Sequence, residues 1–125
     1  MKSIFINKMS EIPIYKQIYD QVVPQILSGE LKSNSTLPSI RTMAKEIRVS
    51  VITIKKTWDE LEKNGYINTI PGKGSYVSAH TEKTLEEMKN DLIKSVFKDG
   101  IIQCKALNIS KTDIIEIIED LYNLS

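Results

Sequence analysis

Two short helical patterns lie three residues apart in the middle of the chain, and few folds accommodate that spacing. We predict the first helix over residues 39–47 and the second over residues 51–64, with Ser39 and Ser50 as their N-caps. Apolar residues recur at helical spacing in both patterns, at Ile40, Met43, Ala44, Ile47, Ile54, Trp58 and Leu61. Two amphipathic helices joined by so tight a turn are typical of a helix-turn-helix.

The segments on either side complete a small fold. A helix is predicted over residues 13–28, where Pro13 suits the first turn and Pro24 should kink the helix or weaken its last turn. Further along, two β-prone runs at 66–70 and 75–77 enclose a Pro-Gly-Lys-Gly turn, which predicts a β-hairpin. Three helices followed by a hairpin make a winged helix-turn-helix.

The remaining residues predict two more helices. A long helical pattern covers 84–107, with Thr84 as the first residue of an expected capping box, and it should continue through Gly100. A last pattern covers 111–122, and Ser110 is its expected N-cap. The residue between these two helices, an asparagine, tolerates the left-handed conformation that ends a helix.

The chain therefore divides into a winged helix-turn-helix domain at 1–80 and a helical tail at 81–125, and its fold class is mainly α with one small β-hairpin. Charge is unevenly distributed between these parts, although the whole chain carries a net charge of only +1. The first part holds eleven Lys and Arg against seven Asp and Glu, and the second holds six against nine. A basic domain with an acidic tail suits a protein that presents one face to phosphates.

Several classes of function find no support in the composition. No apolar run approaches the roughly 18 residues of a membrane helix, and no signal peptide is recognisable, so a cytoplasmic protein without a membrane partner is expected. Cys104 and His80 are the only residues of their types, which leaves no metal-ligand spacing and little acid–base chemistry near neutral pH. Cys104 is expected to be a small buried apolar residue. We predict no enzymatic activity, no cofactor and no metal.

The second helix of a helix-turn-helix lies in the major groove of DNA, with its first turn at the base edges. In the pattern at 51–64, Ile54 faces the core, which leaves the first turn and two lysines facing outward. Lys73, between two glycines at the hairpin tip, is placed to grip phosphates or to enter the minor groove. The expected DNA-contacting residues are Ser39, Arg41, Ser50, Val51, Ile52, Thr53, Lys55, Lys56, Gly72, Lys73 and Gly74.

Each basic feature taken alone has a plainer explanation. Lys55 and Lys56 are also typical of an ordinary solvated helix face, and a Gly-Lys-Gly sequence is typical of any turn. Their combination, in the order of a winged helix, favours binding to double-stranded DNA. The alternative is a winged helix that serves as a protein-interaction module, whose second helix would be acidic or apolar; Lys55, Lys56 and Lys73 speak against it.

Six short motifs between Ile12 and Val77 resemble, in order, those of the GntR family of bacterial regulators. They are Pro13-Ile14-Tyr15-x-Gln17-Ile18, Gly29-x-Leu31, Leu37-Pro38-Ser39-x-Arg41, Val49-Ser50-x-x-Thr53-Ile54, Leu61-Glu62-x-x-Gly65-Tyr66-Ile67 and Gly72-x-Gly74-x-Tyr76-Val77. The short tail, with Cys104–Ser110 at its joint, resembles the YtrA-like branch, whose C-terminal region is a small dimerisation unit.

The resemblance implies a transcriptional repressor that binds an operator, often that of a membrane-transport operon. It implies DNA contacts from Arg41, Ser50, Thr53, Lys55, Gly72 and Lys73. Relatives usually carry an arginine after the serine, and there it reads guanine, whereas this chain has Val51. Valine cannot donate a hydrogen bond to guanine. Either Val51 and Ile52 pack on thymine methyl groups, or nothing replaces the arginine and binding is weaker, and the sequence leaves both interpretations open.

The tail is expected to join two copies of the chain. One small module makes too few contacts for tight specific binding, so a homodimer on a pseudo-palindromic operator is expected. Alternatively, the apolar residues of 111–122 pack on the helix at 13–28 of the same chain. A small-molecule effector, if one exists, would bind at the dimer interface or between the two parts, and the sequence does not identify it. The expected interface residues are Leu85, Met88, Leu92, Val96, Ile114, Ile117, Ile118 and Leu121.

Overall fold

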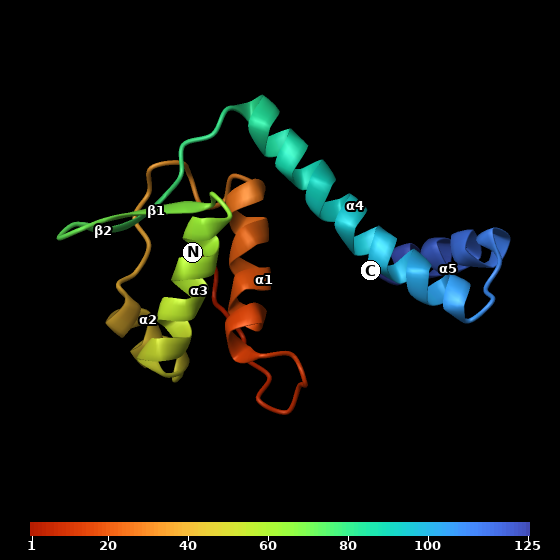
Figure 1. Ribbon diagram of the computed structural model, residues 1–125, viewed down its shortest axis with the longest axis horizontal. Helices are drawn as coiled ribbons and strands as arrows, with labels where there is room; N and C mark the ends of the chain where they lie inside the picture. The colour runs from red at the N-terminus through yellow and green to blue at the C-terminus, as the bar shows by residue number, and fades with distance from the viewer. The chain divides into compact units, whose positions relative to one another are not determined.

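The computed structural model describes all residues from 1 to 125, which form five helices and one two-stranded antiparallel sheet (Figure 1). This confirms the predicted fold class. Two compact units are present, Met1–Leu85 and Glu86–Ser125. The elements are α1 (Ile14–Leu27), α2 (Ile40–Ile47), α3 (Val51–Lys63), β1 (Ile67–Ile70), β2 (Gly74–Val77), α4 (Glu82–Ala106) and α5 (Lys111–Leu124).

Serine side chains begin three of the helices, as the sequence predicts. The hydroxyl oxygens of Ser39, Ser50 and Ser110 each accept a hydrogen bond, at 3.1 Å, from the backbone N–H three residues later. Each bond satisfies one of the donors that the first turn of a helix leaves unpaired, which stabilises the helix by about 1 kcal/mol. Between α2 and α3, Arg48 adopts the left-handed conformation (φ 57°) that ends α2 and starts the tight turn.

The predicted start of α4 was wrong by about one turn. The helix begins at Glu82, and the hydroxyl oxygen of Thr81 accepts the Thr84 N–H at 3.1 Å. Thr84 therefore lies inside the first turn and is capped, whereas the sequence pattern predicts it as the cap. The cause is that Thr81 offers the same hydroxyl acceptor one turn earlier.

Packing between α1 and α3 forms the core of the first unit. Ile18 and Val22 of α1 and Ile54 and Leu61 of α3 are fully buried, and Trp58 is 3% exposed. Burial of each such side chain contributes about 1.5–3 kcal/mol. Ile54, Trp58 and Leu61 are the expected inner stripe of α3, so the opposite side of that helix faces outward.

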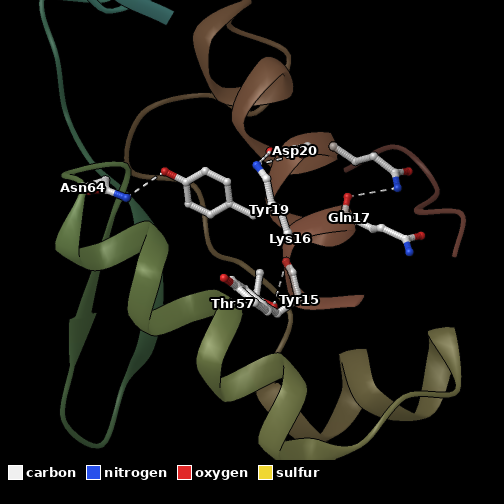
Figure 2. Close-up of polar contacts among 8 residues, drawn as sticks. Tyr15, Lys16, Gln17, Tyr19, Asp20, Thr57 and Asn64 are labelled. Atoms are coloured by element: carbon white, nitrogen blue, oxygen red, sulfur yellow. Dashed lines mark hydrogen bonds and ion pairs between the residues drawn. The ribbon is translucent and has the colours of Figure 1, made fainter. Parts of the chain in front are cut away.

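Polar contacts fix the register of α3 on α1 at two heights (Figure 2). The Thr57 hydroxyl, in the middle of α3, lies 2.9 Å from the Thr53 backbone oxygen and 3.4 Å from the Tyr15 oxygen of α1, so its one proton is shared between the two acceptors. One turn further along α1, the Tyr19 hydroxyl oxygen accepts a hydrogen bond from the Asn64 amide at 2.8 Å. Partial burial raises the pKa of the Tyr19 phenol.

The helix α1 continues through Pro24 and ends at Leu27. Helical hydrogen bonding persists there, since the Ser28 N–H donates to the Pro24 oxygen at 2.9 Å. Pro24 has no N–H to donate to the Asp20 oxygen one turn earlier, so α1 loses one bond there without ending, and the expected kink or weakening stays a prediction.

The hairpin has a third segment that the sequence pattern does not predict. In the hairpin itself Ile67 pairs with Val77 and Ile70 with Gly74. Residues 34–37, which belong to none of the predicted helices and strands, add to the free edge of β2. An isolated bridge joins Thr36 to Tyr76, and three backbone hydrogen bonds flank it. This strand-like pairing ties the loop before α2 to the hairpin.

The second unit consists of most of α4 together with α5. The long helix continues through Gly100 as predicted, and Asn108 adopts the predicted left-handed conformation (φ 59°) between the two helices. Neither helix contains a fully buried residue. None of the helices in the chain combines the length and apolarity needed to cross a membrane.

Candidate nucleic-acid interface

The outward side of α3 carries the residues expected to meet the base edges. Val51 is 44% exposed and Ile52 is 81% exposed, which is unusual for two large apolar side chains at the first turn of a helix. Lys55 and Lys56 follow on the same exposed side, and Thr53 is half-buried at its edge. The helix therefore buries one face in the core and presents a mixed apolar and basic face to solvent.

The two lysines of α3 have different environments. The Lys55 ammonium forms an ion pair with Asp59 one turn on, at 2.9 Å, and both side chains remain more than half exposed. An exposed pair of this kind contributes little, so it holds Lys55 only loosely. The Lys56 ammonium lies 4.1 Å from the centre of the Tyr15 ring, over its face. This cation–π contact positions Lys56 beside α1.

The N-terminal turn of α2 forms a second cluster. The Ser39 hydroxyl donates to the Thr42 hydroxyl oxygen at 2.8 Å while its oxygen accepts the Thr42 N–H, so the cap is fully engaged. Arg41 is exposed and takes part in none of the ion pairs of the chain. Its guanidinium is therefore free to form a bidentate contact with a phosphate or a base.

At the start of α3, Ser50 and Thr53 interact in the same way as Ser39 and Thr42 at the start of α2. The Ser50 and Thr53 hydroxyl oxygens lie 2.7 Å apart, and the Ser50 oxygen also accepts the Thr53 N–H. The cap engages only one of the first-turn N–H groups. The remaining N–H groups of that turn carry the partial positive charge of a helix N-terminus, which favours a phosphate.

The hairpin tip is held in shape by backbone conformation and by one tyrosine. Gly72 and Gly74 both have positive φ angles, 78° and 103°, which other residues rarely adopt. Between them, the Lys73 N–H donates to the Ile70 oxygen at 2.9 Å. The Tyr76 hydroxyl donates to the Lys73 oxygen at 3.1 Å, so the lysine backbone is fixed while its side chain stays exposed.

A carboxylate connects the hairpin to α3. The Thr69 N–H, on the edge of β1 that faces away from β2, donates to a Glu62 oxygen at 2.6 Å. The Thr69 and Ser75 hydroxyls lie 2.9 Å apart across the hairpin. Because Glu62 belongs to the last turn of α3, this bond sets the position of the hairpin relative to the helix.

All eleven residues expected to contact DNA belong to the first unit, in three clusters: the start of α2, the outward side of α3 and the hairpin tip. Their assignment as DNA contacts stays a prediction. Sequence reasoning missed the residues that support these clusters, namely Tyr15, Glu62 and Tyr76. All three occur in the family-like motifs of the chain, but only the folded chain shows which partner each one meets.

The expected dimer residues are divided between half-buried and exposed positions. Leu85, Met88, Leu92 and Ile114 are half-buried, whereas Val96, Ile117, Ile118 and Leu121 are 40–60% exposed. An apolar groove of about 250 Å³ lies between α4 and α5. Cys104, expected to be buried, is half-buried and lines this groove. The groove residues are Val96, Phe97, Gly100, Ile101, Cys104, Ile114, Ile117 and Ile118.

Comparison with known proteins gives consistent results for sequence and structure. The family model described as "Bacterial regulatory proteins, gntR family" matches residues 14–77. The HTH-type transcriptional repressor YtrA of Bacillus subtilis is 35% identical over 118 residues, which cover 94% of this chain and 91% of the relative.

Solved structures similar to this one include members of the same family. A GntR family transcriptional regulator from Listeria monocytogenes matches with a TM-score of 0.76 and 29% identity, over 92% of this chain and 98% of the other. The DNA-binding domain of AraR in complex with operator ORX1 matches with a TM-score of 0.53 and 25% identity, over 59% of this chain and 92% of the other. With a family match over half its length and a relative aligned almost end to end, this chain belongs to the GntR family of bacterial transcriptional regulators.

Proposed function

We propose that two copies of this chain bind a pseudo-palindromic operator and repress transcription from it. The observation that carries this proposal is the face of α3: its inner stripe is buried on α1, while Val51, Ile52, Lys55 and Lys56 are exposed. The clusters at Arg41 and Lys73 extend the basic surface beyond the helix. Regulation of a membrane-transport operon, implied by the resemblance to the YtrA-like branch, is part of the proposal. Such a regulator would act in the bacterial cytoplasm.

In the proposed complex, the first turn of α3 meets the base edges in the major groove. Lys55, Lys56 and Arg41 neutralise phosphates on either side, and the N-terminus of α3 accepts one more. Lys73 contacts the backbone or the minor groove next to it. The phosphate contacts supply most of the affinity, whereas the first turn of α3 supplies the sequence preference.

Sequence preference in this scheme rests on Val51 and Ile52. Both are exposed, and neither side chain can form a hydrogen bond with a base. The group in the major groove that suits an apolar side chain is the C5-methyl of thymine. We therefore propose an A/T-rich step under the tip of α3. The alternative is that Val51 makes no base contact at all, and the effect of replacing thymine by uracil on the affinity decides between the two.

The tail supplies the proposed dimer interface. Ile117, Ile118 and Leu121 lie on one side of α5, are 40–60% exposed, and continue the apolar groove between the two tail helices. Exposed apolar side chains gathered in this way are typical of a protein interface. A second copy of the same surface would cover them with two-fold symmetry, which matches a two-fold operator.

The first prediction concerns the phosphate contacts. Arg41→Ala and Lys73→Ala should each weaken operator binding and lower the slope of log affinity against log salt by about 0.9, the value for one phosphate contact. Fluorescence anisotropy at several salt concentrations measures both quantities. Lys98→Ala, which removes an exposed lysine from α4, is the matched control and should change neither. If the DNA affinity of the wild type did not change with salt concentration, the winged helix would instead be a protein-interaction module.

The second prediction concerns thymine methyl groups. Replacing thymine by uracil at the step under Val51 and Ile52 removes only the methyl group. Affinity should then fall about fivefold or more, corresponding to roughly 1 kcal/mol for one apolar base contact. Uracil at a site position outside the α3 footprint is the control. Unchanged affinity at the contacted step would show that Val51 does not substitute for the guanine-reading arginine of its relatives.

The third prediction concerns the dimer. Ile117→Asp places a charge on the exposed apolar side of α5 and should convert the dimer to a monomer, because a buried unpaired charge is strongly unfavourable. Sedimentation equilibrium measures the mass. Asn123→Asp adds the same charge to the same helix outside the apolar stripe and should leave the mass unchanged. A wild-type chain that is monomeric at micromolar concentration contradicts the proposed interface.

A further inference from the structure

Residues 2–7, which precede α1, are held against that helix by a row of glutamine side chains. We call this segment the N-terminal strap. Gln17, Gln21 and Gln25 lie four residues apart, so they form one line along α1. The side-chain oxygens accept the backbone N–H groups of Asn7, Phe5 and Lys2, at 2.8, 3.0 and 2.8 Å respectively.

Two of the glutamines also donate to the strap. The Gln21 amide donates to the Phe5 oxygen at 2.7 Å, and the Gln17 amide donates to the Asn7 oxygen at 3.0 Å. Each side chain therefore pairs with both polar groups of one strap residue, as a neighbouring β-strand would. The geometry fits the first two pairs, because the four residues from Gln17 to Gln21 rise about 6 Å along the helix and the two residues from Asn7 to Phe5 span about 6.6 Å as a strand. Lys2 lies three residues from Phe5, and Gln25 pairs with its N–H alone.

The strap also faces α2. Ile4, in its middle, is 8% exposed. Residues 1–4 line a groove of about 630 Å³ together with Met43, Glu46 and Ile47 of α2. On the other side, residues 4–8 line a hollow of about 450 Å³ with the end of α2 and Arg48. The strap thus lies between the glutamine line of α1 and the second half of α2.

This location matters because α2 is only eight residues long. A helix of two turns has little stability of its own, so its orientation depends on the elements packed around it. On one side α2 packs on α3, and the groove and hollow place the strap beside Met43, Glu46 and Ile47 of α2. A change in the strap would therefore move Arg41, at the start of α2, relative to the first turn of α3.

We propose that the N-terminal strap is a positioning element of the DNA-binding unit, and that Gln17, Gln21 and Gln25 are positioning residues for the contacts made by α2 and α3. This inference rests on the proposed function. The strap itself contacts no base in the proposed complex. It aligns the two clusters that do meet DNA, so its loss should reduce specific binding more than non-specific binding.

The test replaces the three glutamines by methionine, which has a similar length and helix propensity and does not pair with the strap. Amide hydrogen exchange should show reduced protection at Phe5 and Asn7. Operator affinity should fall about tenfold, the effect of one misplaced base contact. Affinity for non-specific DNA and its salt slope should stay unchanged, because every lysine and arginine remains. Gln103→Met, the remaining glutamine of the chain, is the matched control.

A second variant acts from the strap side. Phe5→Pro removes the N–H that Gln21 accepts and leaves α1 untouched, so it decides the matter if the triple variant fails to fold. Equal operator affinity in wild type and variants would overturn the positioning role alone. Parallel losses of specific and non-specific affinity in a variant that keeps its helical circular-dichroism spectrum would also overturn it, because a positioning role predicts loss of specific binding only. A wild-type chain without any operator binding would overturn the proposed function, and the positioning role with it.

Discussion

Burial of the inner stripe of α3 on α1 is the interaction on which the rest of the structure depends. Ile54 and Leu61 are inaccessible to solvent against Ile18 and Val22, and this packing fixes which side of α3 faces outward. Polar bonds then set the register, with Thr57 bound to the Tyr15 backbone and Asn64 to Tyr19 (Figure 2). A rotation of α3 would expose apolar side chains and break these bonds, so the outward face is specified as strongly as the core.

The candidate interface is held in place by groups that do not themselves face DNA in the proposed complex. Glu62 joins the end of α3 to the hairpin, and Tyr76 fixes the backbone of Lys73. The glutamine line and the strap add a third support, next to α2. Each support is a side chain bonded to the backbone of another segment, and such bonds fix position without filling the core. The rigid fold thereby presents three separate clusters in one arrangement.

The elements and their caps could be predicted from the sequence because both depend on neighbouring residues. Ser39, Ser50 and Ser110 cap helices within three residues of themselves, and the apolar spacing of α3 identified its buried side. Where two hydroxyls compete for one cap, as with Thr81 and Thr84, local pattern does not decide. The pairing of Thr36 with Tyr76 and of Gln21 with Phe5 joins segments distant in sequence. No periodicity signals such contacts, so they became visible only in the folded chain.

The central claim is that α3 and its flanking clusters read a symmetric operator as a dimer. Selection of bound fragments from genomic DNA, followed by titration of the best site against salt, tests it most directly. The proposed mode of binding predicts enrichment of one two-fold symmetric site, whose affinity falls steeply as salt rises because several phosphates are neutralised. Failure to enrich any sequence, or affinity independent of salt, would contradict it.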